Sequence, residues 1–385
     1  MKLNYKKLGK YIRQVDVRNI SGIEENLLGV SVQKKFIPSI ANTVGTDFRK
    51  YKVLKKGQFT YIPDTSRRGD KIGIALLSEY DEGLVSNVYT VFEVIDTNEL
   101  VPEYLMLWFS RPEFDRYSRF KSHGSVREIF DWEQLCNVEL PVPGIEKQKS
   151  IVQAYKIITD RIILKQEIND NLVQTIQTLY KYQFIESGNQ YDQKPLIELC
   201  SKIGSGATPK GGKTAYCEDG ISLIRSTNVF DYGFTYKDLA HISDKQANAL
   251  SNVAIEPYDV LFNITGVSVA RCCIVPMDVL PARVNQHVMI LRPVDGKSMS
   301  YYMMATLCYS DNKSKLLGIG QSGSTREAIN KQEMENFIIP VPPQDEIVEF
   351  GERTDALYTR IETNVNEIQQ LESLQQMLLS QLSSC

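Results

Sequence analysis

Residues 124–143 read GSVREIFDWEQLCNVELPVP and residues 323–342 read GSTREAINKQEMENFIIPVP, so one segment occurs twice at an offset of 199 residues. Eight of the twenty positions are identical without a gap, including the Gly-Ser-x-Arg-Glu start and the Pro-Val-Pro end. A period near 200 residues is too long for a solenoid or propeller repeat. Each copy is therefore expected to be a whole domain followed by a helix.

The bulk composition is that of an ordinary globular protein. The 385 residues leave room for two domains with sizeable cores, and 42% of them are hydrophobic and 24% charged. No apolar run approaches the ~20 residues that a membrane span needs, and the N-terminus lacks the pattern of a signal peptide. Seven cysteines without a C-x-x-C pair, with only three histidines, support neither a zinc site nor a disulfide framework. We therefore expect a reduced, cytoplasmic protein without a metal site.

The net charge of −3 conceals an uneven distribution of charge. Residues 345–385 carry 2 basic and 8 acidic side chains, whereas residues 31–71 carry 10 basic and 3 acidic ones. A basic patch can bind phosphate whatever the total charge of the molecule. A charged run can equally be a solvated face, so charge alone leaves nucleic-acid binding open.

Each copy consists of short β-like runs broken by Gly, Pro, Asn and Asp, followed by a helical stretch at 103–110 and at 300–309. Alternation of apolar and polar residues in the runs is typical of strands with one buried face. This mixed order predicts an α+β domain. The predicted boundaries are 1–145 for the first domain, 146–185 for a long helix, 186–195 for a linker, 196–344 for the second domain and 345–385 for a second long helix.

After each Pro-Val-Pro, apolar residues recur at alternating steps of four and three, in the same register at the 199-residue offset. Such seams over about five heptads predict a coiled coil, although two helices that each lie on their own domain would share this periodicity. Antiparallel pairing would bury both seams and place Lys165 near Asn364, a polar contact suited to fixing register. The fold expected is two similar domains separated by this helix pair, with pseudo-twofold symmetry. The predicted seam comprises Ile151, Ile158, Ile162, Lys165, Leu172, Leu357, Ile361, Asn364, Leu371 and Leu378.

Two motifs have the spelling of nucleotide-binding loops but lack the setting. Residues 207–214 resemble a phosphate loop, and residues 318–323 spell G-x-G-x-x-G. Both motifs need a buried strand before them and a helix after them, which the flanking residues do not provide. Neither a methyltransferase tetrad nor a nuclease carboxylate pair is convincing. We therefore predict that the chain has no catalytic residues of its own.

Side chains that can reach base edges or phosphates gather where the two copies differ. The sequences at the ends of the two copies agree, whereas the sequences in the middles differ. We therefore expect the ends to have the same function in both copies and the middles to have two different functions. Some of these side chains could equally be ordinary surface groups. The predicted DNA-binding residues are Ser31, Lys34, Lys35, Asn42, Thr43, Thr65, Ser66, Arg67, Arg68, Lys71, Lys210, Lys213, Arg225, Ser226, Thr227, Asn228, Asn263, Thr265, Arg271 and Gln286, the last within the run Asn285-Gln286-His287.

The whole chain resembles the specificity subunit of type I restriction–modification systems. Its junctions read Pro141-Val-Pro-Gly-Ile-Glu-Lys-Gln148 and Pro340-Val-Pro-Pro-Gln-Asp-Glu-Ile347, the second with Ile where the family pattern has Gln. The second domain opens with Gly204-Ser-Gly-Ala-Thr-Pro209 and continues to Ile224-Arg-Ser-Thr-Asn228, which is also a familiar pattern in that family. The resemblance rests on the order and duplication of these motifs.

The resemblance implies a non-catalytic reader of double-stranded DNA with two target-recognition domains and two conserved spacer helices. It implies that the domains read the two halves of an asymmetric bipartite site and that the chain positions two adenine methyltransferase (modification) subunits, with restriction (translocase) subunits in the full complex. S-adenosylmethionine, ATP and Mg²⁺ are then expected on the partners and no cofactor on this chain. The residues expected to bind partners are Arg127, Glu128, Pro143, Arg326, Glu327 and Pro342.

Two other classes of protein stay open at this point. A self-contained DNA methyltransferase or nuclease would act on DNA without partners. A two-domain scaffold that binds only proteins would not retain DNA in a salt-dependent manner.

Overall fold

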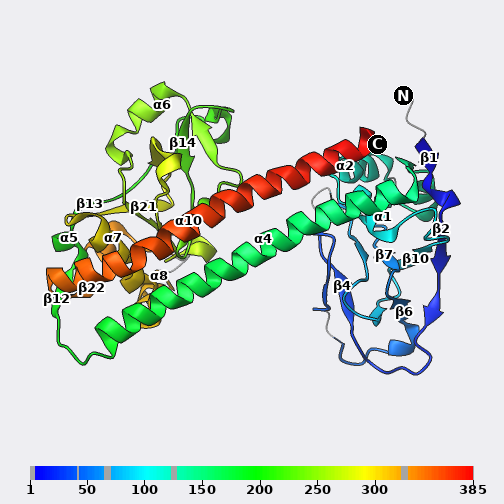
Figure 1. The fold of residues 1–385 in the computed structure, drawn as a ribbon, viewed down its shortest axis with the longest axis horizontal. Coiled ribbons are helices and arrows are strands. Elements are labelled where there is room, and N and C mark those ends of the chain that lie inside the picture. The colour runs from blue at the N-terminus through cyan, green and yellow to red at the C-terminus, as the bar shows by residue number, and fades with distance from the viewer. Residues whose placement is uncertain (1–4, 41–42, 65–70, 123–127, 322–327, 385) are drawn as a thin grey trace. The chain divides into compact units, whose positions relative to one another are not determined.

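The computed structural model describes residues 5–40, 43–64, 71–122, 128–321 and 328–384. The chain forms two compact units, Met1–Arg161 with Glu372–Cys385, and Ile162–Leu371 (Figure 1). Each unit contains one mixed α+β domain and the adjoining turns of two long helices. Among the residues described, no helix is both long and apolar enough to cross a membrane.

The first unit is built around an antiparallel sheet in the order β2-β10-β7-β8. Its strands are β2 (Ile12–Val15), β7 (Phe59–Tyr61), β8 (Ile74–Leu76) and β10 (Thr90–Val94). A second sheet has the order β3-β6-β9, and β4 and β5 form a hairpin. These strands are β3 (Val17–Arg18), β4 (Leu28–Val30), β5 (Phe36–Pro38), β6 (Lys52–Lys55) and β9 (Glu82–Val85). The short helices are α1 (Pro102–Phe109), α2 (Pro112–Lys121) and α3 (Trp132–Cys136).

Aromatic side chains fill the core between this sheet and α1. Phe59 stacks on Phe92 with 4.9 Å between ring centroids, and Phe109 at the end of α1 meets Phe59 edge-on at 5.9 Å. All three rings are fully buried. Burial of each such ring stabilises the fold by roughly 1.5–3 kcal/mol, which explains why the alternating apolar positions of β7 and β10 face α1.

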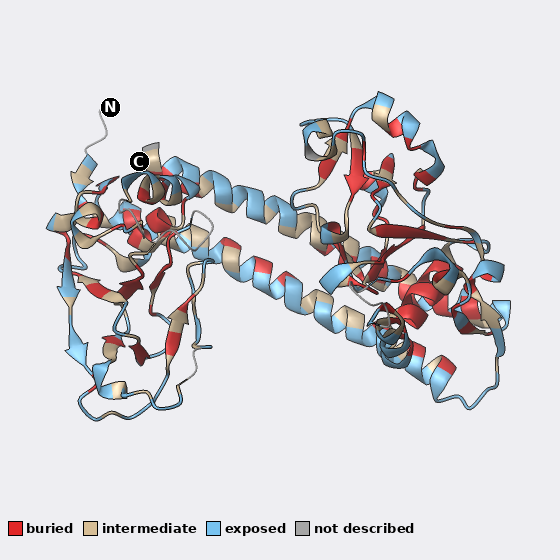
Figure 2. Cartoon of the chain, turned by 180° about the vertical axis from the view of Figure 1, so that it is seen from behind, coloured by how far each residue is buried: buried red, intermediate tan, exposed pale blue. Residues whose placement is uncertain are grey.

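The second unit repeats the plan with a sheet in the order β13-β21-β18-β19. Its strands are β13 (Cys200–Ser205), β18 (Val260–Asn263), β19 (Cys272–Ile274) and β21 (Val288–Pro293). The other strands are β14 (Ile221–Ile224), β15 (Val229–Phe230), β16 (Gly233–Phe234), β17 (Ala240–Ile242) and β20 (Ala282–Val284). The short helices are α5 (Leu196–Leu199), α6 (Asp244–Ala249), α7 (Gly296–Cys308), α8 (Ser310–Gln321) and α9 (Lys331–Glu335). Figure 2 shows the buried residues concentrated on α7 and on the strands beside it.

The duplication seen in the sequence extends to strand order and to single contacts. Each domain closes with a two-stranded pair, β1 (Tyr5–Lys7) with β11 (Glu139–Pro141), and β12 (Asp192–Pro195) with β22 (Ile338–Val341). The Tyr104 hydroxyl donates to the Pro141 carbonyl at 3.1 Å, and the Tyr302 hydroxyl donates to the Pro340 carbonyl at 2.6 Å. The three-stranded sheets differ. In the second domain the sheet has the order β17-β14-β20, and β14 pairs parallel with β20; in the first domain β6 is antiparallel to both its neighbours, β3 and β9. The domain ends are thus alike and the middles are not.

The two long helices are α4 (Ile145–Tyr180) and α10 (Gln344–Gln381). They pack against each other in both units: Gln375 donates to Thr159 Oγ1 at 2.7 Å in the first, and Lys165 Nζ donates to Asn364 Oδ1 at 3.2 Å in the second. Residue numbers rise along one helix as they fall along the other, so the pairing is antiparallel. The predicted helix pair and its polar contact are confirmed.

The predicted seam faces inward along the pair. Ile158, Ile162, Lys165, Ile361 and Asn364 are buried, and Ile151, Leu172, Leu357, Leu371 and Leu378 are half-buried. Near the end of α10 the buried position moves on by one residue to Leu379, which packs into the core of the first unit with Leu382. Lys165 also forms an ion pair with Glu367, and Asn364 donates to Asn169 at 2.8 Å.

Candidate nucleic-acid interface

In the second domain, four connections meet at one end of the main sheet. They follow β13, β14, β18 and β20, and backbone hydrogen bonds join them: Asn285 N to Ile224 O at 3.0 Å, Gly206 N to Asn285 O at 3.2 Å, and Ile264 N to His287 O at 3.0 Å. These connections carry most of the second domain's predicted DNA-binding residues. The sequence scattered them over about 80 positions, and the sheet brings them together.

Gly206 makes the closest approach in this cluster. A Cβ atom built at Gly206 would lie 1.7 Å from the carbonyl oxygen of Val284. No side chain fits there, because backbone atoms cannot move aside as a flexible side chain can. The glycine of the Gly204–Pro209 motif is therefore required for the loop after β13 to dock beside the β20–β21 connection.

A chain of polar side chains lies across these connections. The Thr208 hydroxyl donates to Gln286 Oε1, Gln286 Nε2 lies 3.0 Å from His287 Nε2, and His287 Nδ1 lies 2.8 Å from Thr265 Oγ1. Thr208 and Gln286 are exposed, and Thr265 and His287 are half-buried. Amide and hydroxyl groups held in this way can donate to and accept from base edges without first losing conformational freedom. Thr208 was not among the predicted side chains; its position in the glycine-rich motif was the signal available.

Two arginines of the cluster are oriented by aromatic rings. The Arg271 guanidinium lies 5.0 Å from the centroid of Phe230, a ring that is 44% exposed, and the Arg225 guanidinium lies 5.8 Å from that of Tyr216. Arg225 also donates to the carbonyl of Asp238. Stacking restricts a long side chain while leaving other guanidinium N–H groups available. Phe230 and Tyr216 were not predicted from the sequence.

Two predicted DNA-binding residues of this domain have structural roles. Asn228 is fully buried; its Oδ1 accepts from Arg225 N at 3.1 Å and its amide donates to Thr235 O at 2.9 Å. Asn263 is also fully buried and donates to Ser226 O at 2.9 Å. Neither side chain has surface to offer a ligand in this conformation. Both hold the loops whose exposed neighbours, such as Thr227, reach solvent.

In the first domain, Lys34 likewise differs from the prediction. Its side chain is only 7% exposed, and its ammonium group lies 2.8 Å from Asp115 and donates to the carbonyl of Phe109. Burial lowers the pKa of Lys34, although Asp115 opposes the shift. Lys34 therefore fastens the β4–β5 turn to α1 and α2, because a desolvated ammonium needs such partners. Lys35 and Lys71 are exposed, and Ser31 and Thr43 are half-buried.

Several predicted residues lie outside the residues that the structure describes. For Lys210 the side chain is exposed, whereas the side chain of Lys213 is not described. The predicted residues that the structure does not describe at all are Asn42, Thr65, Ser66, Arg67, Arg68, Arg127, Arg326 and Glu327.

The strands on either side of the β7–β8 connection in the first domain and of the β18–β19 connection in the second domain occupy equivalent places in the two sheets. The β7–β8 connection contains residues 65–71, and the topologically equivalent β18–β19 connection contains Thr265 and Arg271. Asp64 bridges to Ile129, and Thr265 bridges to Ala328. In both domains the chain after the Gly-Ser-x-Arg-Glu repeat therefore returns beside the candidate reading connection.

The Pro-Val-Pro junctions have a separate position, between a closing strand and a long helix. In the first domain the buried Gln148 organises the junction, since its amide donates to Glu99 O and Pro143 O at 2.9 and 2.8 Å and its Oε1 accepts from Val101 N. In the second domain Ile347, also buried, fills the equivalent position. Glu128, expected to bind a partner, forms an ion pair with Arg119.

The comparisons with known proteins agree with this architecture. Residues 3–174 and 189–373 match the family model of the type I restriction modification DNA specificity domain. The chain is 23% identical over 307 residues to the MjaIX specificity subunit of Methanocaldococcus jannaschii, an alignment that covers 75% of this chain and 70% of that one. It is 26% identical over 161 residues to the HindI specificity subunit of Haemophilus influenzae, covering 41% and 34%.

Among solved structures, the S subunit of a type I restriction–modification system from M. genitalium is similar, with a TM-score of 0.59. The alignment covers 99% of this chain and 96% of that chain at 13% identity, which shows a shared fold. In this family the cofactors reside on the modification and restriction subunits. Because the family model matches two segments that together span most of the sequence, the chain belongs to the type I restriction modification DNA specificity family, as a non-catalytic DNA specificity subunit of a type I restriction–modification complex.

Proposed function

We propose that the two domains read the two halves of one asymmetric, bipartite site in double-stranded DNA. The observation that carries this proposal is the equivalence of the β7–β8 and β18–β19 connections, which lie at the same place in the same strand order but differ in sequence. A shared frame with different side chains at its reading end suits two different half-sequences.

In the second domain, the side chains proposed to contact bases are those of the polar chain and the stacked arginines. Their donors and acceptors suit base edges, whereas a lysine acts chiefly as a point charge toward phosphate. The proposed base-contacting residues are Thr208, Arg225, Ser226, Thr227, Thr265, Arg271, Gln286 and His287, with Lys210 and Lys213 toward phosphates.

In the first domain, the exposed lysines Lys35 and Lys71 are proposed as phosphate contacts, with Ser31 and Thr43 nearby in sequence. Asn42 and residues 65–68 keep the base-contacting role expected from the sequence. Lys34, Asn228 and Asn263 are no longer included, because their side chains are buried and engaged within the protein.

We further propose that the segments that repeat bind partners that repeat, namely two copies of an adenine methyltransferase subunit, with restriction subunits joining the complex. Two identical partners require two equivalent surfaces, and the β1–β11 and β12–β22 pairs with their Pro-Val-Pro junctions supply them. Pro143 and Pro342 lie at these junctions. The partner roles of Arg127, Glu128, Arg326 and Glu327 rest on the repeat alone.

The test is to express the chain with its methyltransferase and to sequence the methylated adenines. Arg271→Ala and Gln286→Ala should relax or abolish recognition of one half-site and leave the other half-sequence unchanged. Each base contact is worth ~1–3 kcal/mol of discrimination. Lys245→Ala, an exposed position on α6 outside the cluster, is the matched control and should leave the methylated motif as it is. If one variant changed both half-sequences together, the proposal that each domain reads one half-site would be contradicted.

Two further measurements separate this function from its alternatives. The purified chain alone, incubated with DNA and S-adenosylmethionine, should not methylate DNA, whereas a self-contained methyltransferase would. The chain with its methyltransferase should retain DNA with a steep dependence on salt, whereas a purely protein-binding scaffold would not retain it. Adding one heptad to both α4 and α10 should widen the gap between the half-sites without altering either half-sequence.

A further inference from the structure

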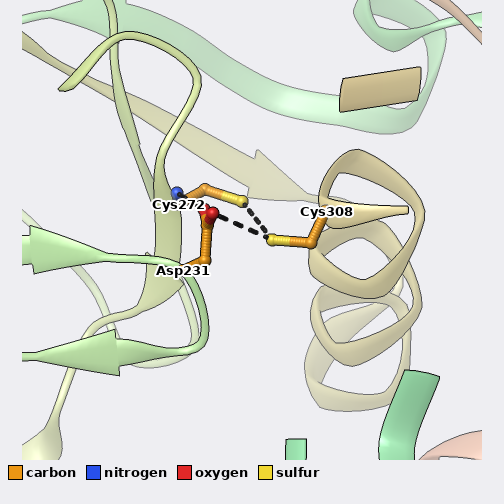
Figure 3. A group of neighbouring side chains, drawn as sticks. All are labelled: Asp231, Cys272 and Cys308. Atoms are coloured by element: carbon orange, nitrogen blue, oxygen red, sulfur yellow. Dashed lines mark hydrogen bonds between the residues drawn. The ribbon is translucent and has the colours of Figure 1, made fainter. Parts of the chain in front are cut away.

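Three side chains from three elements of the second domain converge beside α7. Asp231 lies in the turn between β15 and β16, Cys272 is the first residue of β19, and Cys308 is the last residue of α7 (Figure 3). The two sulfur atoms are 3.4 Å apart, and Cys308 Sγ lies 3.7 Å from Asp231 Oδ1. One ligand atom from each residue lies within 4.8 Å of the others. Two thiols and a carboxylate are a donor set for a borderline-soft divalent cation.

The spacing of these atoms is close to that of a tetrahedral zinc site. With Zn–S bonds of about 2.3 Å and Zn–O bonds of about 2.0 Å, tetrahedral edges are about 3.8 Å between sulfurs and about 3.5 Å between sulfur and oxygen. The observed 3.4 and 3.7 Å differ from these edges by a few tenths of an ångström. The third edge, between Cys272 Sγ and an Asp231 oxygen, is at most 4.8 Å, so small side-chain shifts would complete a three-ligand set with one position left for water or another ligand.

An ion pair and a backbone hydrogen bond hold the Asp231 carboxylate in place. Lys313 Nζ lies 2.7 and 2.9 Å from the two oxygens of Asp231, and the Cys272 backbone N–H donates to Asp231 Oδ1 at 3.1 Å. Hydrogen bonds of this kind to a ligating carboxylate are usual. Two thiolates, Asp231, Lys313 and a divalent cation together carry no net charge, so the bound state avoids burying an unbalanced charge. The C-terminal end of α7, where Cys308 lies, also favours a cation.

The residue after Asp231 carries a buried polar group without a partner in the part of the chain that the structure describes. The Tyr232 side chain is 5% exposed, and its hydroxyl has no hydrogen-bond partner among the described residues. Tyr232 N donates to Cys272 O at 3.0 Å, which fixes the Tyr232 backbone beside the cluster. A buried unpaired hydroxyl calls for an explanation such as an ion or water. Cys308 also lines a surface cavity of about 420 Å³, together with Tyr309 and residues of α4.

Among the residues described in the first domain, no equivalent cluster is found. The residues at the topologically equivalent positions are Ile74, which pairs across the sheet with Tyr61 as Cys272 does with Phe262, and Phe109, the last residue of α1. Both are fully buried parts of an apolar core. Within the part of the chain that the structure describes, the thiol and carboxylate cluster therefore occurs in the second domain and does not follow the duplication.

We propose that Asp231, Cys272 and Cys308 bind one Zn²⁺ ion, which ties the β15–β16 turn, β19 and α7 together. Binding forms two metal–sulfur bonds and one metal–oxygen bond and releases the two thiol protons to solvent. Because two protons are displaced per ion, apparent affinity should fall by up to about 100-fold for each unit by which the pH is lowered. The ion would stabilise the second domain through Asp231 and Cys272, which directly follow Phe230 and Arg271 of the candidate interface, and through Cys308.

The test uses the full-length chain, reduced and stripped with a chelator. Zn²⁺ is measured by competition with a chromophoric chelator, and Cd²⁺ by its thiolate charge-transfer absorbance. We expect one equivalent of either ion per chain, a higher thermal unfolding midpoint with metal, and the stated pH dependence. Wild-type chain that shows no saturable one-equivalent binding would refute the proposal without recourse to any variant.

Variants then locate the site. Cys272→Ala and Cys308→Ala should each lower affinity by at least about 100-fold, and Asp231→Asn, which keeps both thiols, by about tenfold. Cys200→Ala is the matched control, since Cys200 is a partly buried thiol of the same domain near Met303 and outside the cluster. Circular dichroism without metal checks that each variant is folded. Equal binding by folded Cys272→Ala and wild-type chains would show that the three residues form an ordinary packed cluster.

Discussion

Replacing Lys165 by Met should measure how much the buried charge contributes to the free energy of unfolding. The substitution keeps an unbranched side chain at the seam of the helix pair. The Lys165 side chain is 8% exposed, donates to Asn364 and pairs with Glu367. The substitution takes a donor from Asn364 Oδ1 in a residue that is fully buried, and leaving a buried acceptor unsatisfied costs about 1–3 kcal/mol. The Glu367 side chain is 32% exposed, so water can take up its carboxylate and adds little to the cost.

The expected loss of unfolding free energy is therefore about 1–3 kcal/mol, measured by urea unfolding followed through the helical circular dichroism signal. Lys156→Met is the matched control on the same helix: its side chain is 64% exposed in an i,i+4 pair with Asp160, and its removal should cost less than about 0.5 kcal/mol. The double variant Lys165→Met, Asn364→Leu should recover part of the lost stability, because an apolar pair replaces the polar one while the half-buried Asn169 loses the donor it has in Asn364. If Lys165→Met proved as stable as Lys156→Met, the polar contact would contribute nothing and the reasoning would fail.

Three further outcomes are expected from thermal unfolding and DNA-retention measurements. Lys34→Ala should destabilise the first domain by about 1–3 kcal/mol through loss of a buried ion pair. Lys35→Ala should leave stability unchanged and lower the slope of log affinity for DNA against log salt concentration by about one. Equal effects of the two variants would contradict the structural role of Lys34 and the phosphate-contacting role of Lys35. Gln148→Ile should destabilise the first domain by about 1–3 kcal/mol, because it strands the Val101 N–H and two carbonyls. Gly206→Ala should lower the unfolding midpoint of the second domain, since its Cβ would meet a backbone carbonyl at 1.7 Å; an unchanged midpoint would show that the loop can dock elsewhere.

Departures from the sequence predictions have local physical causes. Lys34 and Asn228 are residue types that often contact DNA, but the fold buries both side chains. Buried polar groups need hydrogen-bond or ion-pair partners. Lys34 pairs with Asp115, and Asn228 accepts a hydrogen bond from Arg225 N. Exposure cannot be inferred from residue type at a turn, because it depends on what packs over that turn. The Ile347 departure from the family junction is similarly local, since an apolar side chain can fill the space that Gln148 bridges with hydrogen bonds in the other copy.

The sequence by itself determined the duplication, the mixed α+β character of each copy and the antiparallel helix pair with its Lys165–Asn364 contact. These follow from periodicity and offset, which are local properties of a chain. Only the tertiary structure decided which scattered loops share one end of a sheet, so that Thr208 meets Gln286 and Arg271 stacks on Phe230. It also brought together Asp231, Cys272 and Cys308, separated by 41 and 36 residues, which spacing rules for metal ligands do not anticipate. Strand pairing joins residues distant in sequence, and no local pattern records which partners the sheet will choose.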